Sequence, residues 1–185
     1  MTLDATQVRV GISGELYKAA LGSTAPTDAT TALDAAFVGL GYVSEDGVTE
    51  SWDDSVDDIV AWQGATTVRS ATTESTSSLE LTLIQTSAAV LEAFHRGSTV
   101  TEPEVGEYQI DVVPINADPS AWVLDVVDGT KLIRIYVGNG EVVERGEIMY
   151  ANGEPIGYPL TIRCYPDASG NLMQKFSNDD AWDPA

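Results

Sequence analysis

The residues of this sequence best suited to chemistry are clustered carboxylates. Seven of them lie in the fifteen-residue stretch SEDGVTESWDDSVDD, Ser44 to Asp58, which holds no Lys or Arg. Such a cluster could bind Ca²⁺, but this one lacks the glycine and the distal glutamate of the D-x-[DN]-x-[DN]-G-x5-E loop, so it allows a weak divalent cation site at most. Glu50 and Asp53 beside Trp52 resemble the carboxylate pair of a glycoside hydrolase. Because the chain carries 29 acidic residues, such pairs arise without function, and we predict no enzyme, no metal site and no cofactor.

Other reactive side chains are single and have structural interpretations. His95 is the only histidine and lies in the last turn of a predicted helix, where its positive charge would suit the helix dipole. Cys164 is the only cysteine and lies on the apolar side of a predicted strand, as an inert buried thiol would. The glycines of residues 11–14 and 39–41 lack both the G-x-G-x-x-G spacing and a following helix, which excludes a phosphate-binding loop.

Composition limits the functional classes further. The chain has 185 residues, 43% of them apolar, which is enough for one domain with a core. Its net charge of -20 repels phosphate and disfavours a basic nucleic-acid-binding surface. A single cysteine excludes an internal disulfide and fits assembly in a reducing cytoplasm. The sequence contains neither a recognisable export signal nor an apolar run long enough to span a membrane.

Most of the sequence alternates apolar and polar residues with period two, which predicts strands. One short segment, residues 86–96, has helical spacing, with Thr86 or Ser87 able to cap its start and Gly97 following its end. We therefore predict a mainly β fold, a two-sheet antiparallel sandwich or barrel with one flanking helix. The predicted strands cover residues 8–12, 16–21, 37–43, 48–52, 68–74, 78–84, 108–113, 121–127, 131–137, 141–150 and 158–165.

These elements suggest one domain that spans residues 1–185 in three parts. Residues 1–32 would form an N-terminal strand or hairpin and an arm, residues 33–165 the core sandwich, and residues 166–185 a polar C-terminal arm. Within the core, turns are predicted at Glu45 to Gly47, Asp128-Gly129, Asn139-Gly140 and Asn152-Gly153, and an acidic loop at residues 44–62. The arms, Gly22 to Ala32 and Pro166 to Ala185, are too polar to fold alone, so we expect them to order on a neighbouring subunit.

Three sequence features together resemble a known family. They are V-x-V-G-x-S-G-E-L-Y at Val8 to Tyr17, G-Y-V-S-E-D-G-V at Gly41 to Val48, and S-L-E-L-T-L-I-Q-T-S-x-x-V-L-x-x-F at Ser78 to Phe94. Residues 33–97 as a whole resemble the central part of the major tail proteins, or tail tube proteins, of long-tailed bacteriophages, especially those of actinobacterial hosts. The resemblance implies the tail-tube fold and homo-hexameric rings that stack into a tube. It also implies tape measure and tail terminator proteins as partners.

The charge of the chain agrees with such a function, because a conduit for DNA must not hold its cargo. We expect residues 50–62 to form a docking loop between subunits or stacked rings, with the two tryptophans as apolar anchors and the aspartates as a charged rim. Basic residues are scarce, so four arginines are candidate partners across this contact. The predicted interface residues are Glu50, Trp52, Asp53, Asp54, Asp57, Asp58, Trp62, Arg69, Arg134, Arg145 and Arg163.

Three alternatives stay open at this point. Trp52 and Trp62 could fill the subunit's own core instead of an interface. The chain could be another virion protein, such as a tail terminator, a connector or a decoration subunit, which would form single rings or isolated oligomers. An extracellular carbohydrate-binding sandwich or adhesin would share the strand pattern and the acidic aromatic stretch.

Overall fold

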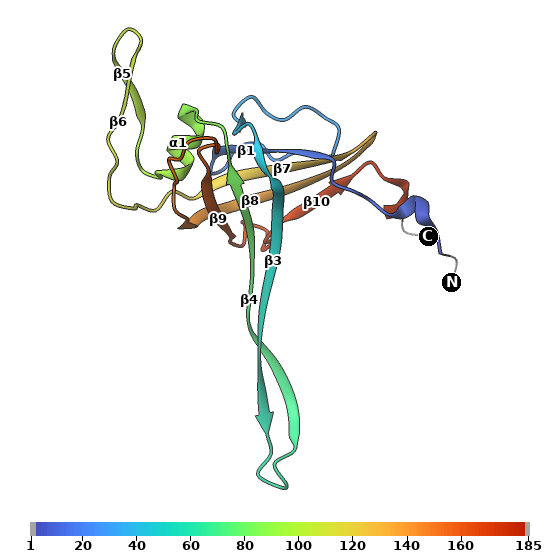
Figure 1. Ribbon diagram of the computed structural model, residues 1–185. Helices are drawn as coiled ribbons and strands as arrows, with labels where there is room; N and C mark the ends of the chain where they lie inside the picture. The colour runs from blue at the N-terminus through green and yellow to red at the C-terminus, as the bar shows by residue number, and fades with distance from the viewer. Residues whose placement is uncertain (1–2, 184–185) are drawn as a thin grey trace.

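The computed structural model describes residues 3–183 and is mainly β, as the sequence predicts (Figure 1). Residues 1–2 of the predicted N-terminal part and residues 184–185 of the predicted C-terminal arm lie outside the described residues. An antiparallel sheet has the strand order β2-β1-β7-β8-β9-β4-β3, with β10 on the free part of β8, and β5 pairs with β6 separately. The strands are β1 (Ser13–Ala20), β2 (Val38–Gly39), β3 (Val43–Val60), β4 (Thr67–Leu83), β5 (Val100–Glu104), β6 (Glu107–Ile110), β7 (Ser120–Asp128), β8 (Lys131–Arg145), β9 (Tyr158–Cys164) and β10 (Gln174–Ser177).

The large sheet rolls up around the main core, so that β1 approaches β3 from the other end of the strand order. Alternate residues of two strands are buried here, Leu79, Leu81 and Leu83 of β4 and Tyr158, Leu160, Ile162 and Cys164 of β9. The helix α1 (Ala88–Phe94) adds Val90, Ala93 and Phe94 to the same core. It is shorter than the predicted residues 86–96, but Ser87 caps it as expected, and its side chain accepts a hydrogen bond from the Val90 amide.

Two turn predictions have different outcomes. Asp128-Gly129 turns the chain between β7 and β8 as predicted, and Gly129 has a φ of 61°. The turn predicted at Asn139-Gly140 is wrong, because both residues lie inside the single long strand β8. Glycine is needed at position 140 for a different reason, because a Cβ on this residue would lie 2.8 Å from the Trp122 ring. The Nε1 of that ring donates a hydrogen bond of 3.1 Å to the Gly140 carbonyl.

The predicted arm Gly22–Ala32 folds onto its own subunit. Ala29 is buried, and Phe37 at the end of this connection packs with Val123 and Tyr136 on the second face of the sheet. The Arg134 guanidinium donates hydrogen bonds to the carbonyls of two residues of the arm, Asp28 (3.1 Å) and Thr31 (2.7 Å). The expectation that a neighbouring subunit must order this segment is therefore wrong.

The predicted C-terminal arm is also held within the subunit. Its strand β10 pairs antiparallel with β8, which extends the large sheet. After β10, the buried Asp179 carboxylate forms an ion pair with Arg9, and Lys131 lies 3.7 Å from the same carboxylate. We call this contact between the N-terminal and C-terminal segments the clasp. Polar side chains can therefore order both ends of the chain with little apolar burial.

Acid is expected to open the clasp only at low pH. The hydrogen bond from Arg9 lowers the pKa of Asp179 from 3.8 to about 2. A carboxyl group whose pKa is lower in the folded state stabilises the fold above its unfolded pKa, so this contribution is lost as the pH falls from about 4 to about 2. NMR titration should show the C-terminal amides shifting in that range. In Asp179→Asn the transition should be absent, and an unchanged titration would contradict the assignment.

Candidate functional site

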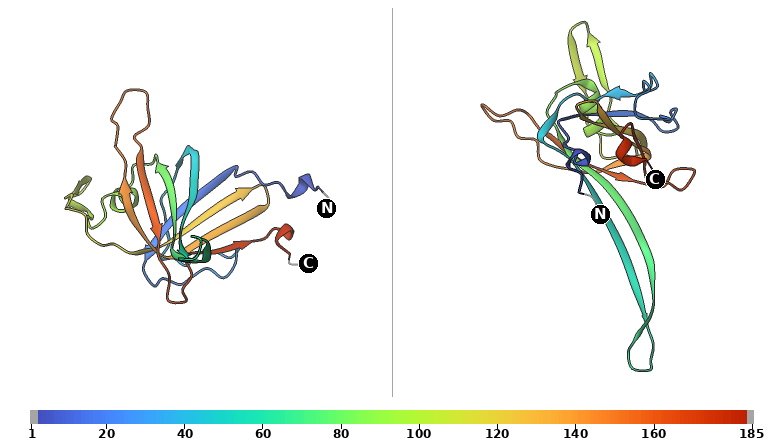
Figure 2. Two further views of the ribbon diagram at one scale, coloured as in Figure 1. Left: turned by 90° about the horizontal axis from the view of Figure 1, so that it is seen from below. Right: turned by 90° about the vertical axis from the view of Figure 1, so that its right-hand side faces the viewer.

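The most prominent surface feature is a long hairpin made by the distal halves of β3 and β4 (Figure 1). The neighbouring strand β9 ends where Cys164 pairs with Ser77, so beyond this point β3 and β4 pair only with each other. We call residues 52–76 the arm, and from here on this name no longer refers to the two arms predicted from the sequence. The arm projects far from the body in Figure 1 and in the right view of Figure 2.

The arm corrects the prediction of an acidic loop at residues 44–62. Most of that stretch is strand β3, and the hairpin turn predicted at Glu45 to Gly47 is an irregularity within the strand. Between the pairs Val43–Leu83 and Val48–Leu81, four residues of β3 oppose Thr82 alone, and Gly47 has a φ of 73°. Asp-Gly supplies positive φ for a bulge as readily as for a turn, so the sequence signal is ambiguous. The true turn lies at residues 61–66, where the Ala61 amide donates to the Thr66 carbonyl at 2.9 Å.

The tryptophans of the arm do not lie in the core. Trp62 is 97% exposed in the turn, and Trp52 is 51% exposed, with its Nε1 donating to the Glu50 carboxylate at 2.7 Å. This exposure rules out the alternative that both tryptophans fill the subunit's own core. Four further large apolar side chains of the arm are more than half exposed: Val56, Ile59, Val60 and Val68. An exposed apolar surface of this kind is typical of an interaction site.

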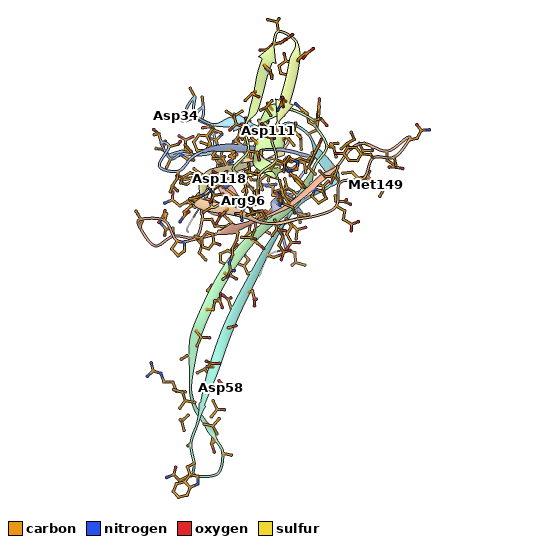
Figure 3. The ribbon with its side chains drawn as sticks, turned by 90° about the vertical axis from the view of Figure 1, so that its left-hand side faces the viewer. Asp34, Asp58, Arg96, Asp111, Asp118 and Met149 are labelled. Carbon is orange, nitrogen blue, oxygen red and sulfur yellow. The ribbon has the colours of Figure 1, made fainter. Side chains whose placement is uncertain are left out.

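Charge divides the arm into two parts. The part near the body, which we call the shaft, carries exposed carboxylates on β3 that are not balanced by arginines or lysines of the arm (Figure 3 labels Asp58): Asp53, Asp54, Asp57 and Asp58. The outer part, residues 59–69, which we call the tip, contains no Asp or Glu and one cation, Arg69. The tip is thus apolar and weakly positive, whereas the shaft is strongly negative.

Three of the four arginines predicted to cross an interface are engaged within the subunit. Arg134 is buried and forms a paired ion contact with Asp125 at 2.7 and 2.8 Å. Arg163 lies 3.0 Å from Glu74. Arg145 donates to the Phe94 carbonyl at 3.4 Å and stacks over the Phe94 ring. All three therefore have partners within the subunit, and their role across a subunit contact stays a prediction.

Arg69 is the remaining candidate. It is exposed opposite Ile59, and within residues 3–183 it forms no ion pair and no side-chain hydrogen bond. Glu50, at the base of the arm, is bound by Lys175 through both carboxylate oxygens at 2.7 Å. Of the predicted interface residues, the carboxylates of the shaft, the two tryptophans and Arg69 are therefore the ones that lie together on the projecting arm.

A second hairpin, which the sequence did not predict as such, projects from the opposite side of the body. It consists of β5 and β6 with the following two residues, and we call residues 100–112 the short hairpin (Figure 2, right). Its turn exposes Val105 completely, and Tyr108 is 73% exposed. Sequence analysis predicted only one strand here, residues 108–113, because β5 contains Pro103 and two glutamates, which are uncommon in strands.

His95 and Cys164 lie apart from both hairpins. Burial and the nearby Arg145 charge lower the pKa of His95, which weakens the expected interaction of a charged imidazole with the helix end. Burial raises the pKa of the Cys164 thiol to about 11, which keeps it protonated. Among the described residues, no three His, Cys, Asp or Glu side chains converge to hold a metal ion. Nor does a helix of residues 3–183 have the length and apolarity needed to cross a membrane.

Comparison with known proteins gives one family. A family model described as phage tail tube protein matches residues 1–185, the whole chain. A search of curated proteins finds no match. The family match extends the resemblance found in residues 33–97 to the later strands and to both terminal segments.

Proposed function

The chain belongs to the phage tail tube protein family, and we propose that it forms hexameric rings that stack into a hollow tube through which the DNA of a long-tailed phage passes. Members of this family are structural proteins of the virion tail, not enzymes, and they assemble with themselves into a tube in the host cytoplasm. Tape measure and tail terminator proteins are further proposed partners of this chain.

The observation that carries the proposal is the arm. A two-stranded hairpin without other support is marginal in water, yet this one extends well beyond the body and exposes six large apolar side chains. Burial of one such side chain contributes about 1.5–3 kcal/mol, so contact with another subunit would stabilise both the hairpin and the assembly. We place Trp52 and Trp62 as the apolar anchors of that contact and Asp53, Asp54, Asp57 and Asp58 as its charged rim.

The charge of the chain supports a conduit that does not hold DNA. The net charge is -20, and all cations except Arg69 and Arg145 form an ion pair within residues 3–183. Cations that are already neutralised by the protein release fewer counterions from DNA, which weakens non-specific binding. Double-stranded DNA would therefore pass without specific contacts.

Replacement of Trp62 by serine is expected to impair assembly. Loss of one buried anchor, about 1.5–3 kcal/mol, corresponds to a rise of roughly 10- to 150-fold in the critical concentration for polymerisation. Negative-stain electron microscopy and sedimentation of the purified protein measure this, with hollow tubes expected for the parent. The matched control is Met149→Ser, which removes an exposed apolar side chain away from the arm (Figure 3).

Two results would contradict the proposal. If Trp62→Ser and the double variant Trp52→Ser/Asp57→Asn both polymerise like the parent, the arm is not an interface. If the parent forms only monomers or single rings at high concentration, this chain does not build a tube by itself.

A further inference from the structure

We propose that the tip of one copy docks on the short hairpin of a copy in the next ring, with Arg69 bound between Glu104 and Glu107. This inference rests on the proposed function and adds the surface that receives the arm. It follows from where the two hairpins lie, what the short hairpin lacks and what the tip supplies.

The two hairpins lie at opposite ends of the molecule. In Figure 1 the arm points downward and β5 and β6 point upward, and the views turned about the vertical axis in Figures 2 and 3 agree. A contact between different surfaces of identical subunits is heterologous, and it repeats without closing when the subunits are related mainly by translation. Contact between opposite ends is thus the kind that stacks rings into a tube.

The short hairpin has an unsupported apolar face. It is a sheet of two strands only, β5 and β6. Val100 pairs with Ile110, and Tyr108 shares their face because side chains alternate along a strand. Val105 at the turn and Tyr108 are largely exposed. An isolated pair of strands is marginally stable, so a cover over this face would stabilise the short hairpin.

The short hairpin also has an unbalanced charge. Glu104 and Glu107 are direct cross-strand partners, and like charges in that position are destabilising. Glu102 and Asp111 add two further carboxylates, and within residues 3–183 no Lys or Arg forms an ion pair with any of the four. A cation placed between Glu104 and Glu107 would convert their repulsion into attraction.

The tip matches the short hairpin in both respects. It carries Trp62, exposed in its turn, to contact the exposed Val105 in the turn of the short hairpin, and Arg69, which has no partner among the described residues, to bind the two glutamates that flank that turn. Arginine is suited to this role because its planar guanidinium can donate to two carboxylates. The negative shaft would repel the short hairpin, so charge favours end-to-end docking of the tip over sideways contact.

A charge exchange tests the docking. Arg69→Glu, or Glu104→Lys together with Glu107→Lys, should raise the critical concentration for tube formation about tenfold at low salt, because each change replaces attraction by repulsion, and added salt should reduce the effect. The chain with all three changes should polymerise near the parent level. As the matched control, Arg69→Glu with Glu154→Lys, an exposed residue of another loop, should remain impaired.

A cross-link gives a second, geometric readout. Gln63→Cys, next to Trp62 in the turn of the tip, and Val105→Cys are prepared separately, and oxidation should join the two chains only in the mixture, because a disulfide requires Cα atoms within about 7 Å. The native Cys164 is buried and does not compete. The inference is overturned if the triple charge variant is no better than the Glu154→Lys control or if the mixture gives no heterodimer. If either result is found but Trp62→Ser still raises the critical concentration for tube formation, the arm remains an interface and only the proposed docking surface is wrong.

Discussion

A chain in which Asp54–Ser75 is replaced by Asn-Gly is expected to fold like the parent and to remain unassembled. The two-residue turn would join Asp53 to Thr76, which are already cross-strand partners. None of the removed side chains is buried, and only Ala61 and Ala71 are even partly covered. The core therefore stays intact, whereas the tip, its apolar side chains and Arg69 are lost together.

Circular dichroism and thermal unfolding should report a parent-like body for this variant, and electron microscopy should show no tubes at any accessible concentration. The matched control deletes Met149–Gly153, a stretch of exposed residues in the loop between β8 and β9. Tubes of normal appearance from the variant without the arm would contradict the proposed role of the arm in subunit contacts. Loss of folding in this variant would instead mean that the arm stabilises the body, contrary to its exposure.

Arg134→Met is expected to reduce the free energy of unfolding by about 3–5 kcal/mol, because it leaves the carboxylate of Asp125 without its partner in a mostly buried place. It also removes the donor for the carbonyls of Asp28 and Thr31, which holds residues 22–32 against the sheet. For a domain of this size the loss corresponds to a fall in melting temperature of roughly 6–20 °C.

Urea unfolding of the unassembled chain measures this effect without interference from polymerisation. The matched double variant Arg134→Met/Asp125→Leu removes both charges and should recover most of the loss. If Arg134→Met costs less than about 1 kcal/mol, the ion pair is not the element that holds this connection.

The sequence predicted the core well because burial leaves a periodic pattern. Leu79, Leu81 and Leu83 alternate as required for a strand with one buried face, and Ser87 offers the side-chain oxygen that a helix start needs. Each of these signals depends on residues close together in the chain. The mainly antiparallel β fold with one helix followed from signals of this type.

The arm was missed because it has no buried face. Alternation of apolar and polar residues marks a strand only where one side of it meets a core, and residues 53–60 expose both sides. Their dense carboxylates are typical of a solvated loop, so the sequence predicted one. Similarly, Arg134 and Asp125 are nine positions apart on neighbouring strands, and no local pattern shows that they pair within the subunit rather than across an interface.

Continuity of β4 has a consequence for the entropy of assembly. The strand is paired with β9 up to Ser77 and then runs on into the arm without a linker. The body thus orients the base of the arm before any partner arrives, so less conformational freedom is lost on binding than for a hairpin on a free tether. A flexible tether of the same length would lose that freedom at every subunit added. Preorganisation of this kind lets modest contacts at the tip support a long polymer.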